Sequence, residues 1–183
     1  NLEFEGWEAD DVIATLATRA DTAGIKTCVV STDRDAFQLC SENVCLMMTP
    51  RGVADVHVYT PERVEARYGV RPDQVPDFIG LKGDTSDNIP GIPGIGDKTA
   101  GQLIAQYGSL EDVIAHADEL SPARGRAVKE HADQAREVDL GRAIAVNEGI
   151  ADTALLQQLF DRGLQRARTE VAAETDHHPR RET

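Results

Sequence analysis

The chain has 183 residues, a hydrophobic share of 40% and a formal net charge of −13. This length suits one hydrophobic core with a small appended subdomain, and no run of about 18 apolar residues is present that could cross a membrane. The acidic balance argues against nucleic-acid binding over a broad surface, because phosphate binding usually leaves a basic footprint.

Along the first 60 residues, the apolar pattern predicts alternating helices and strands. Apolar residues recur at helical spacing over 8–23. The run IKTCVVS, 25–31, is rich in β-branched residues and predicts a buried strand, parallel to its neighbour. A short helix follows from DAFQLC, and the next two strands are expected over 44–49 and 56–60, joined by a turn at 50–52.

After residue 60 only helices are predicted. Thr60 with Pro61 indicates a helix start, and Gly69 ends that helix. Glycines and prolines exclude a regular helix over 83–96. Ser109 is expected to cap the helix that follows it. The other expected helices cover 72–81, 97–107, 110–118, 122–147 and, with a weaker pattern, 152–168, before a polar tail that we expect to be disordered.

Three clusters of carboxylates lie where an α/β fold places its ligands. One is in the first turn of a helix, one follows a strand, and one is in the glycine-rich stretch. Ligands bind at the carboxyl ends of strands in open α/β sheets, although acids at helix starts and in loops also have purely structural roles. The clusters consist of Glu8, Asp10 and Asp11; Asp33 and Asp35; and Asp84 and Asp87.

A divalent metal ion would explain why these carboxylates should converge. Several carboxylates without Lys or Arg between them repel one another, and a cation removes that cost. Oxygen ligands alone favour Mg²⁺ or Mn²⁺ over Zn²⁺. Two such ions about 4 Å apart can activate water and stabilise the leaving oxygen of a phosphodiester.

The glycine-rich turn before the helix at 97–107 is a candidate phosphate site. Backbone amides at a helix N-terminus bind phosphate oxygens without a basic side chain, and glycine allows close approach. The GxxxxGK[ST] spacing is absent, and an ordinary turn between helices is the alternative. The candidate residues are Gly94, Ile95, Gly96, Lys98 and Thr99.

The motifs EADD, STDRD and GLKGDTSDNIPGIPGIGDKTA occur in this order, followed by YGSLEDVI. Together they resemble the 5′-nuclease (flap endonuclease-like) family, and most nearly the bacterial 5′–3′ exonuclease domain found at the amino end of DNA polymerase I or as a separate protein. The resemblance covers roughly residues 1–150.

The resemblance implies a partial parallel-type α/β sheet of the PIN-like nuclease core over 1–70. A helix–three-turn–helix DNA-binding subdomain is implied over 71–150, and 151–183 holds the weak helix and the tail. The seven acids would bind two Mg²⁺ ions, or Mn²⁺, and carry catalysis. The turn at 94–99 would contact duplex DNA and hold K⁺ with its carbonyl groups. The implied reaction is phosphodiester hydrolysis near the 5′ end of a DNA strand, at flaps, nicks or ends, in replication and repair.

One departure from the family leaves a second function open. The family normally begins with a central strand carrying another metal-binding Asp and continues into a basic helical arch, whereas this chain starts just before EADD. We therefore expect a piece of a longer chain, and an alternative in which it binds duplex DNA without cleaving it. A sugar transferase or phosphatase using TDRD would leave the glycine-rich motif without a role.

The cysteine count agrees with a cytoplasmic protein without membrane partners. Cys28, Cys40 and Cys45 are odd in number and lack zinc-ligand spacing, which indicates reduced thiols. Because Cys28 stands in the apolar run TCVV, we expect its side chain to be buried. His177 and His178, in the tail, are expected to be solvated.

Overall fold

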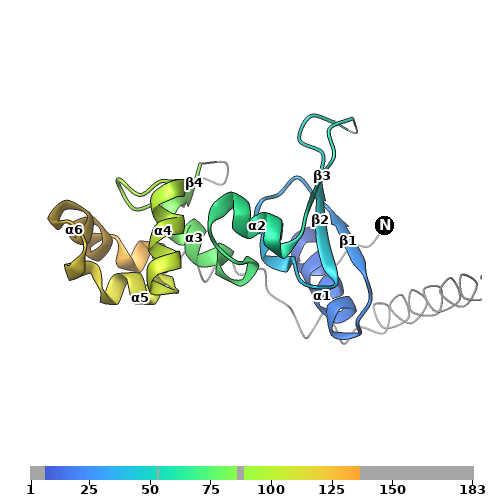
Figure 1. Cartoon of the computed structure of the whole chain (residues 1–183), viewed down its shortest axis with the longest axis horizontal. Coiled ribbons are helices and arrows are strands. Elements are labelled where there is room, and N and C mark those ends of the chain that lie inside the picture. Colours follow the sequence, from blue (N-terminus) through green and yellow to red (C-terminus); the bar gives the residue numbers. More distant parts are fainter. Residues whose placement is uncertain (1–6, 53, 86–88, 137–183) are drawn as a thin grey trace, which may run out of the picture.

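The computed structural model describes residues 7–52, 54–85 and 89–136. These residues form an elongated molecule, with a small sheet and its helix at one end, α2 and α3 in the middle, and the remaining helices at the other end (Figure 1). The α/β class with a following helical part, expected from the sequence, is confirmed.

The sheet end contains α1 (Ala9–Thr22), β1 (Thr27–Val30), the 3₁₀ helix η1 (Asp35–Leu39), β2 (Val44–Met48) and β3 (His57–Tyr59). Strand β1 pairs with β2 in parallel, and β3 pairs with β2 antiparallel. Because β1 and β2 are parallel, their carboxyl ends meet at one edge of the sheet. The TDRD loop and the turn between β2 and β3 therefore both leave the sheet at this edge.

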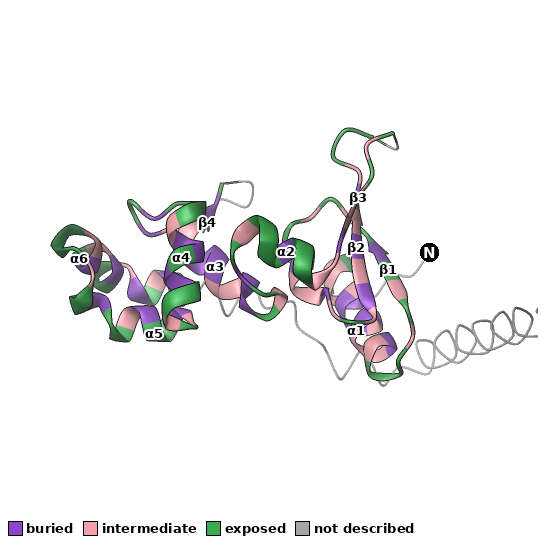
Figure 2. Cartoon of the chain, in the orientation of Figure 1, coloured by how far each residue is buried: buried purple, intermediate pink, exposed green. Residues whose placement is uncertain are grey.

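The two faces of the sheet differ in burial. Val29 and Leu46 are buried in the hydrophobic core, whereas Val30, the next residue of β1, is 65% exposed. Cys28 lies on the same face as Val30 because side chains alternate along a strand. The prediction that Cys28 is buried is therefore wrong: Cys28 is exposed, and Figure 2 shows how much of β1 lacks cover. All three cysteines are free thiols.

Between the sheet and the last helices, the chain forms α2 (Pro61–Tyr68), the 3₁₀ helix η2 (Pro72–Gln74) and α3 (Val75–Lys82). Gly69 ends α2 in the left-handed conformation, with φ of 73°. The single helix expected over 72–81 is divided in two, because a second proline stands at the start of α3 and cannot donate a helical hydrogen bond.

Two short strands, β4 (Gly83–Asp84) and β5 (Ile89–Pro90), pair antiparallel where only an irregular stretch was expected. Two glycines make this pairing possible. A Cβ on Gly91 would lie 2.1 Å from the carbonyl oxygen of Lys82, and a Cβ on Gly83 would lie 2.2 Å from the nitrogen of Gly91. The main chains therefore approach more closely than any other residue type allows.

The helical end contains α4 (Asp97–Tyr107), α5 (Leu110–Ala115), the 3₁₀ helix η3 (Ala117–Glu119) and α6 (Pro122–Glu130). The predicted start and end of α4 are confirmed, and so is the cap of α5, because the Ser109 hydroxyl accepts a hydrogen bond from the Asp112 amide. Residues 132–136 are again helical. The rest of the helix expected over 122–147, the helix over 152–168 and the tail lie outside the described residues. Within the described part, no helix is long and apolar enough to cross a membrane.

Candidate metal and nucleic-acid site

The first acidic cluster is held at the start of α1. Glu8 occupies the N-cap position in an extended conformation, and its amide donates a hydrogen bond to Oδ2 of Asp11, at 3.3 Å. Asp11 therefore closes the first turn of the helix, a structural role for this acid. The side chain of Asp10 is left to interact beyond its own helix.

Asp10 meets Asp33, which follows β1 in the TDRD loop. Partial burial raises the pKa of Asp10 above its ordinary value, and the charges of Asp33, Glu8 and Asp11 raise it further, as does a side-chain hydrogen bond with Asp33. A carboxyl group whose pKa is raised by neighbouring carboxylates favours either protonation or a nearby cation. The structure thus brings together one acid of the first cluster, Asp10, and one acid of the second cluster, Asp33.

Asp33, Arg34 and Asp35 have three different surroundings. Oδ1 of Asp33 accepts the Asp35 amide at 2.9 Å, which bends the loop so that Asp35 begins η1 and is only 4% exposed. Arg34, between them, is exposed and lines three cavities together with residues of α2, α3 and α4. In the bent loop, Asp35 is therefore buried, whereas Arg34, which stands between the two acids, is exposed.

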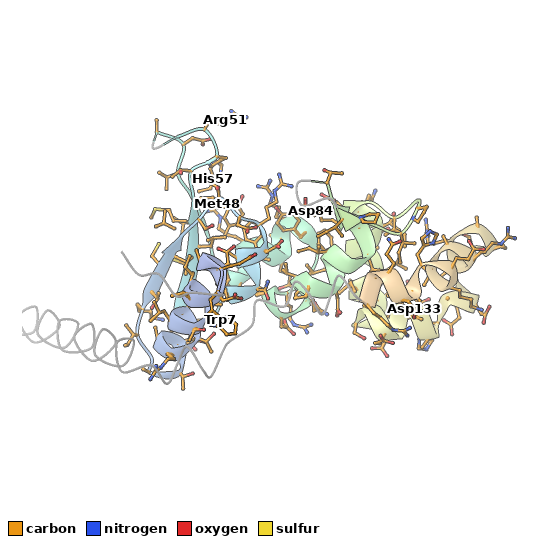
Figure 3. The ribbon with its side chains drawn as sticks, turned by 180° about the vertical axis from the view of Figure 1, so that it is seen from behind. Trp7, Met48, Arg51, His57, Asp84 and Asp133 are labelled. Atoms are coloured by element: carbon orange, nitrogen blue, oxygen red, sulfur yellow. The ribbon has the colours of Figure 1, made fainter. Side chains whose placement is uncertain are left out.

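The third cluster is represented in the described structure by Asp84, which lines the same cavity as Arg34. Asp84, in β4, is buried and lines a cavity of about 20 Å³ with Arg34, Phe37 and Lys82. Figure 3 shows Asp84 beside the helical part, whereas Trp7, which precedes α1, lies with the sheet. Asp87 lies outside the described residues.

The described carboxylates do not by themselves complete a metal centre. Among residues 7–52, 54–85 and 89–136, no three His, Cys, Asp or Glu side chains lie close enough together to hold a metal ion. Asp10 and Asp33 come from different clusters, and their repulsion is the kind that a divalent cation would relieve. Oxygen donors alone fit Mg²⁺ or Mn²⁺.

The candidate phosphate turn stands at the N-terminus of α4. Gly96 is the N-cap, with φ of −108°, and no side chain caps the first turn of the helix. A Cβ on Gly94 or on Gly96 would meet no atom within 4 Å. Packing and backbone conformation therefore do not require glycine at 96, in contrast to Gly83 and Gly91. The open space and the uncapped amides are what an approaching phosphate needs.

Lys98 and Thr99 follow in the first turn of α4, and Ile95 anchors the turn because its side chain is buried in the core. Lys98 is exposed and lines a cavity of about 580 Å³ that also contains Arg34 and Arg67. Sequence reasoning missed both arginines. The available signal was an arginine between the two acids of the TDRD motif, but the net charge of −13 concealed a local concentration of positive charge.

Two family models match adjacent parts of this chain. Residues 1–69 match the 5′–3′ exonuclease N-terminal resolvase-like domain, and residues 70–145 match the 5′–3′ exonuclease C-terminal SAM fold. The chain therefore belongs to the 5′–3′ exonuclease family, as its motifs indicated.

Relatives of known name support this membership. The chain is 49% identical over 138 residues to DNA polymerase I of Bacillus caldotenax, covering 75% of this chain and 15% of that protein. It is 48% identical over 128 residues to DNA polymerase I of Mycobacterium tuberculosis strain H37Rv, covering 70% of this chain and 14% of the relative. The chain thus spans about one seventh of the length of these curated relatives.

The fold is similar to that of a bacteriophage nuclease. The bacteriophage T5 D15 flap endonuclease, solved as a pseudo-enzyme-product complex with DNA and metal ions, superposes with a TM-score of 0.72 at 18% identity, covering 91% of this chain and 62% of that one. The T5 D15 protein co-crystallised with metal ions gives a TM-score of 0.70 at 20% identity, covering 88% and 59%. At this identity the likeness shows a common fold.

Proposed function

We propose that the chain contributes to a structure-specific 5′–3′ exonuclease or flap endonuclease that hydrolyses DNA phosphodiester bonds in replication and repair. The observation that carries the proposal is the contact between Asp10 and Asp33, which come from different motifs and meet at the carboxyl end of β1. Membership of the 5′–3′ exonuclease family supports it. Its substrates would be DNA with a 5′ end, a flap or a nick, in the cytoplasm.

The proposed metal is Mg²⁺, with Mn²⁺ as a substitute, held first by Asp10 and Asp33. Bound there, a divalent ion would lower the pKa of a water molecule and stabilise the leaving oxygen. The other acids of the seven, Glu8, Asp11, Asp35, Asp84 and Asp87, remain proposed contributors. Asp11 and Asp35 also have structural roles, at the start of α1 and of η1 respectively.

The proposed role of the α4 turn is to hold the duplex through a phosphate. The amides of the first turn and the charge of Lys98 would contact it, and Gly96 would leave room for it. Carbonyl groups of the same turn would hold the proposed K⁺. The proposed division of the chain places the nuclease core in 1–70, the DNA-binding subdomain in 71–150 and an appended segment in 151–183.

The chain's own activity is tested on a labelled 5′-flap duplex with Mg²⁺. We expect a short 5′ product from the 183-residue chain and its loss in Asp33→Asn. An Asp73→Asn variant, at a surface carboxylate paired with Arg71, is the matched control and should cleave like the unaltered chain. If the chain neither binds nor cleaves the flap duplex, the proposed function is contradicted.

The alternative, duplex binding without cleavage, is favoured by one observation. No three candidate ligands of the described residues lie close enough together to hold a metal ion. In the same experiment, a gel shift of the flap duplex without any product would support this alternative over nuclease activity.

A further inference from the structure

Two cavities meet on the surface between the sheet and the helical end. One, of about 580 Å³, lies between the end of α2 and the first half of α4. The other, of about 410 Å³, lies between α2 and the turn that joins β2 to β3. Arg34, Arg67 and Tyr68 line both, so that the two cavities are adjacent. We call the pair of cavities the basic groove, with the cations Lys98, Arg67, Arg34 and Arg51.

Three of the four groove cations have no carboxylate partner in the described structure. Among the described residues, no carboxylate oxygen lies within ion-pair distance of Arg34, Arg67 or Lys98, whereas Arg71, Lys129 and Arg136 are all paired. Two acids line the groove. Asp55 lies 2.7 Å from His57 and 4.0 Å from Arg51, so that Arg51 is a paired cation of the groove, and Asp97 lies 3.9 Å from Lys82.

Aromatic residues hold Arg67 in place without neutralising its charge. Its Nη1 donates a hydrogen bond to the hydroxyl of Tyr59, and its guanidinium carbon lies 5.7 Å from the Tyr59 ring centroid and 5.3 Å from that of Tyr68. Such contacts fix the orientation of a guanidinium and leave its charge available to an anion. Arg34 is exposed and lines the same two cavities.

The ends of the groove identify its ligand as a polyanion. One end is Lys98, in the uncapped first turn of α4, and the other is Arg51, on the protruding turn after β2, visible at the edge of the molecule in Figure 3. Arg34, in the middle, is the neighbour of Asp33, which contacts Asp10. A line of separate cations that passes the acidic pair suits successive phosphates of one strand better than a single small anion.

We propose that the basic groove binds the sugar–phosphate backbone of one strand of duplex DNA, with Arg34 and Arg67 each contacting a phosphate. The inference rests on the proposed function and adds the path that links the α4 turn to the acidic pair. It assigns to Arg34 a positioning role: the arginine between two acids holds the strand whose phosphodiester faces Asp10 and Asp33.

The test is the salt dependence of binding of the 183-residue chain to a fluorescein-labelled 20-base-pair duplex, measured by anisotropy in EDTA. Each lost phosphate contact should lower the slope of log K against log salt by about 0.9, and should weaken binding at 0.1 M salt by about eightfold. We expect this change for Arg34→Gln, and roughly twice the change in slope for Arg34→Gln with Arg67→Gln.

Control variants distinguish DNA binding in the basic groove from the proposed nuclease function. Arg126→Gln removes an equally exposed charge on α6, at the far end of the molecule, and should leave the slope unchanged (Figure 1). The Arg34 side chain makes no hydrogen bond to another described residue, and its carbonyl group, which accepts the Phe37 amide, is kept in Arg34→Gln. The single variant therefore remains informative if loss of the Arg67–Tyr59 contact impairs folding. Equal slopes for Arg34→Gln, Arg126→Gln and the unaltered chain would overturn the groove and leave the proposed function standing. Failure of the unaltered chain to bind would overturn both.

Discussion

Replacing Gly96 by aspartate should change stability and DNA binding in opposite directions. Gly96 is the N-cap of α4, has an extended conformation and has no atom within 4 Å of the position a Cβ would take. Aspartate is a preferred N-cap and also interacts favourably with the helix dipole. We therefore expect Gly96→Asp to raise the free energy of unfolding by about 0.5–1 kcal/mol.

The same carboxylate would stand where the phosphate is proposed to bind. Two unit charges about 4 Å apart repel by about 1 kcal/mol in water and by about 4 kcal/mol at a protein surface. The affinity for duplex DNA should therefore fall by at least about fivefold, although the protein becomes more stable.

Urea denaturation followed by circular dichroism measures the first effect, and fluorescence anisotropy with a labelled duplex measures the second. Ser121→Asp, at the N-cap of α6, is the matched control, because it adds the same charge at another helix start. It should leave DNA affinity within about twofold, given its distance from the groove. Unchanged affinity in Gly96→Asp would show that no phosphate binds at the α4 turn.

Three further changes test other parts of the structure. Gly91→Ala should lower the free energy of unfolding by about 2–4 kcal/mol, because its Cβ would lie 2.1 Å from the Lys82 carbonyl oxygen and must separate β4 from β5. A loss below about 0.5 kcal/mol in a urea titration would contradict this contact. Ser109→Ala should cost about 1 kcal/mol in the same titration, because the Asp112 amide loses its cap. Asp10→Asn should stabilise the protein slightly in EDTA, by less than about 1 kcal/mol. Because the folded-state pKa of Asp10 is raised, this gain is full above that pKa and vanishes as the pH falls below the ordinary value of 3.8; a thermal shift that does not depend on pH would contradict the assigned repulsion.

Local signals sufficed for most elements of the fold. The helix at 97–107 was bounded correctly because glycines stand on both sides of it, and the parallel pairing of β1 with β2 follows from the helix that connects strand to strand. The β4–β5 pair was missed because it depends on contact between the main chains of Gly83 and Gly91, which no local pattern reveals. Exposure of Cys28 was missed because composition does not tell which face of a sheet the helix covers.

The sequence predicts which residues of the candidate site meet only where the topology of the fold determines it. The approach of Asp10 to Asp33 follows from a helix start and a strand end at one edge of the sheet. That Asp84 and Arg34 line one cavity depends on tertiary packing, which no local pattern in the sequence reveals. The cations of the basic groove come from α2, α4 and two loops that are far apart in the sequence. The negative net charge of the whole chain therefore did not indicate the groove.

The claim on which the account depends is that Asp10 and Asp33 share one divalent cation. Titration of the 183-residue chain with Mn²⁺, with free Mn²⁺ followed by electron paramagnetic resonance, tests it directly. We expect saturable Mn²⁺ binding whose affinity falls at least about tenfold in Asp10→Asn and in Asp33→Asn and is unchanged in Asp73→Asn. Equal Mn²⁺ affinity in all four proteins would contradict it.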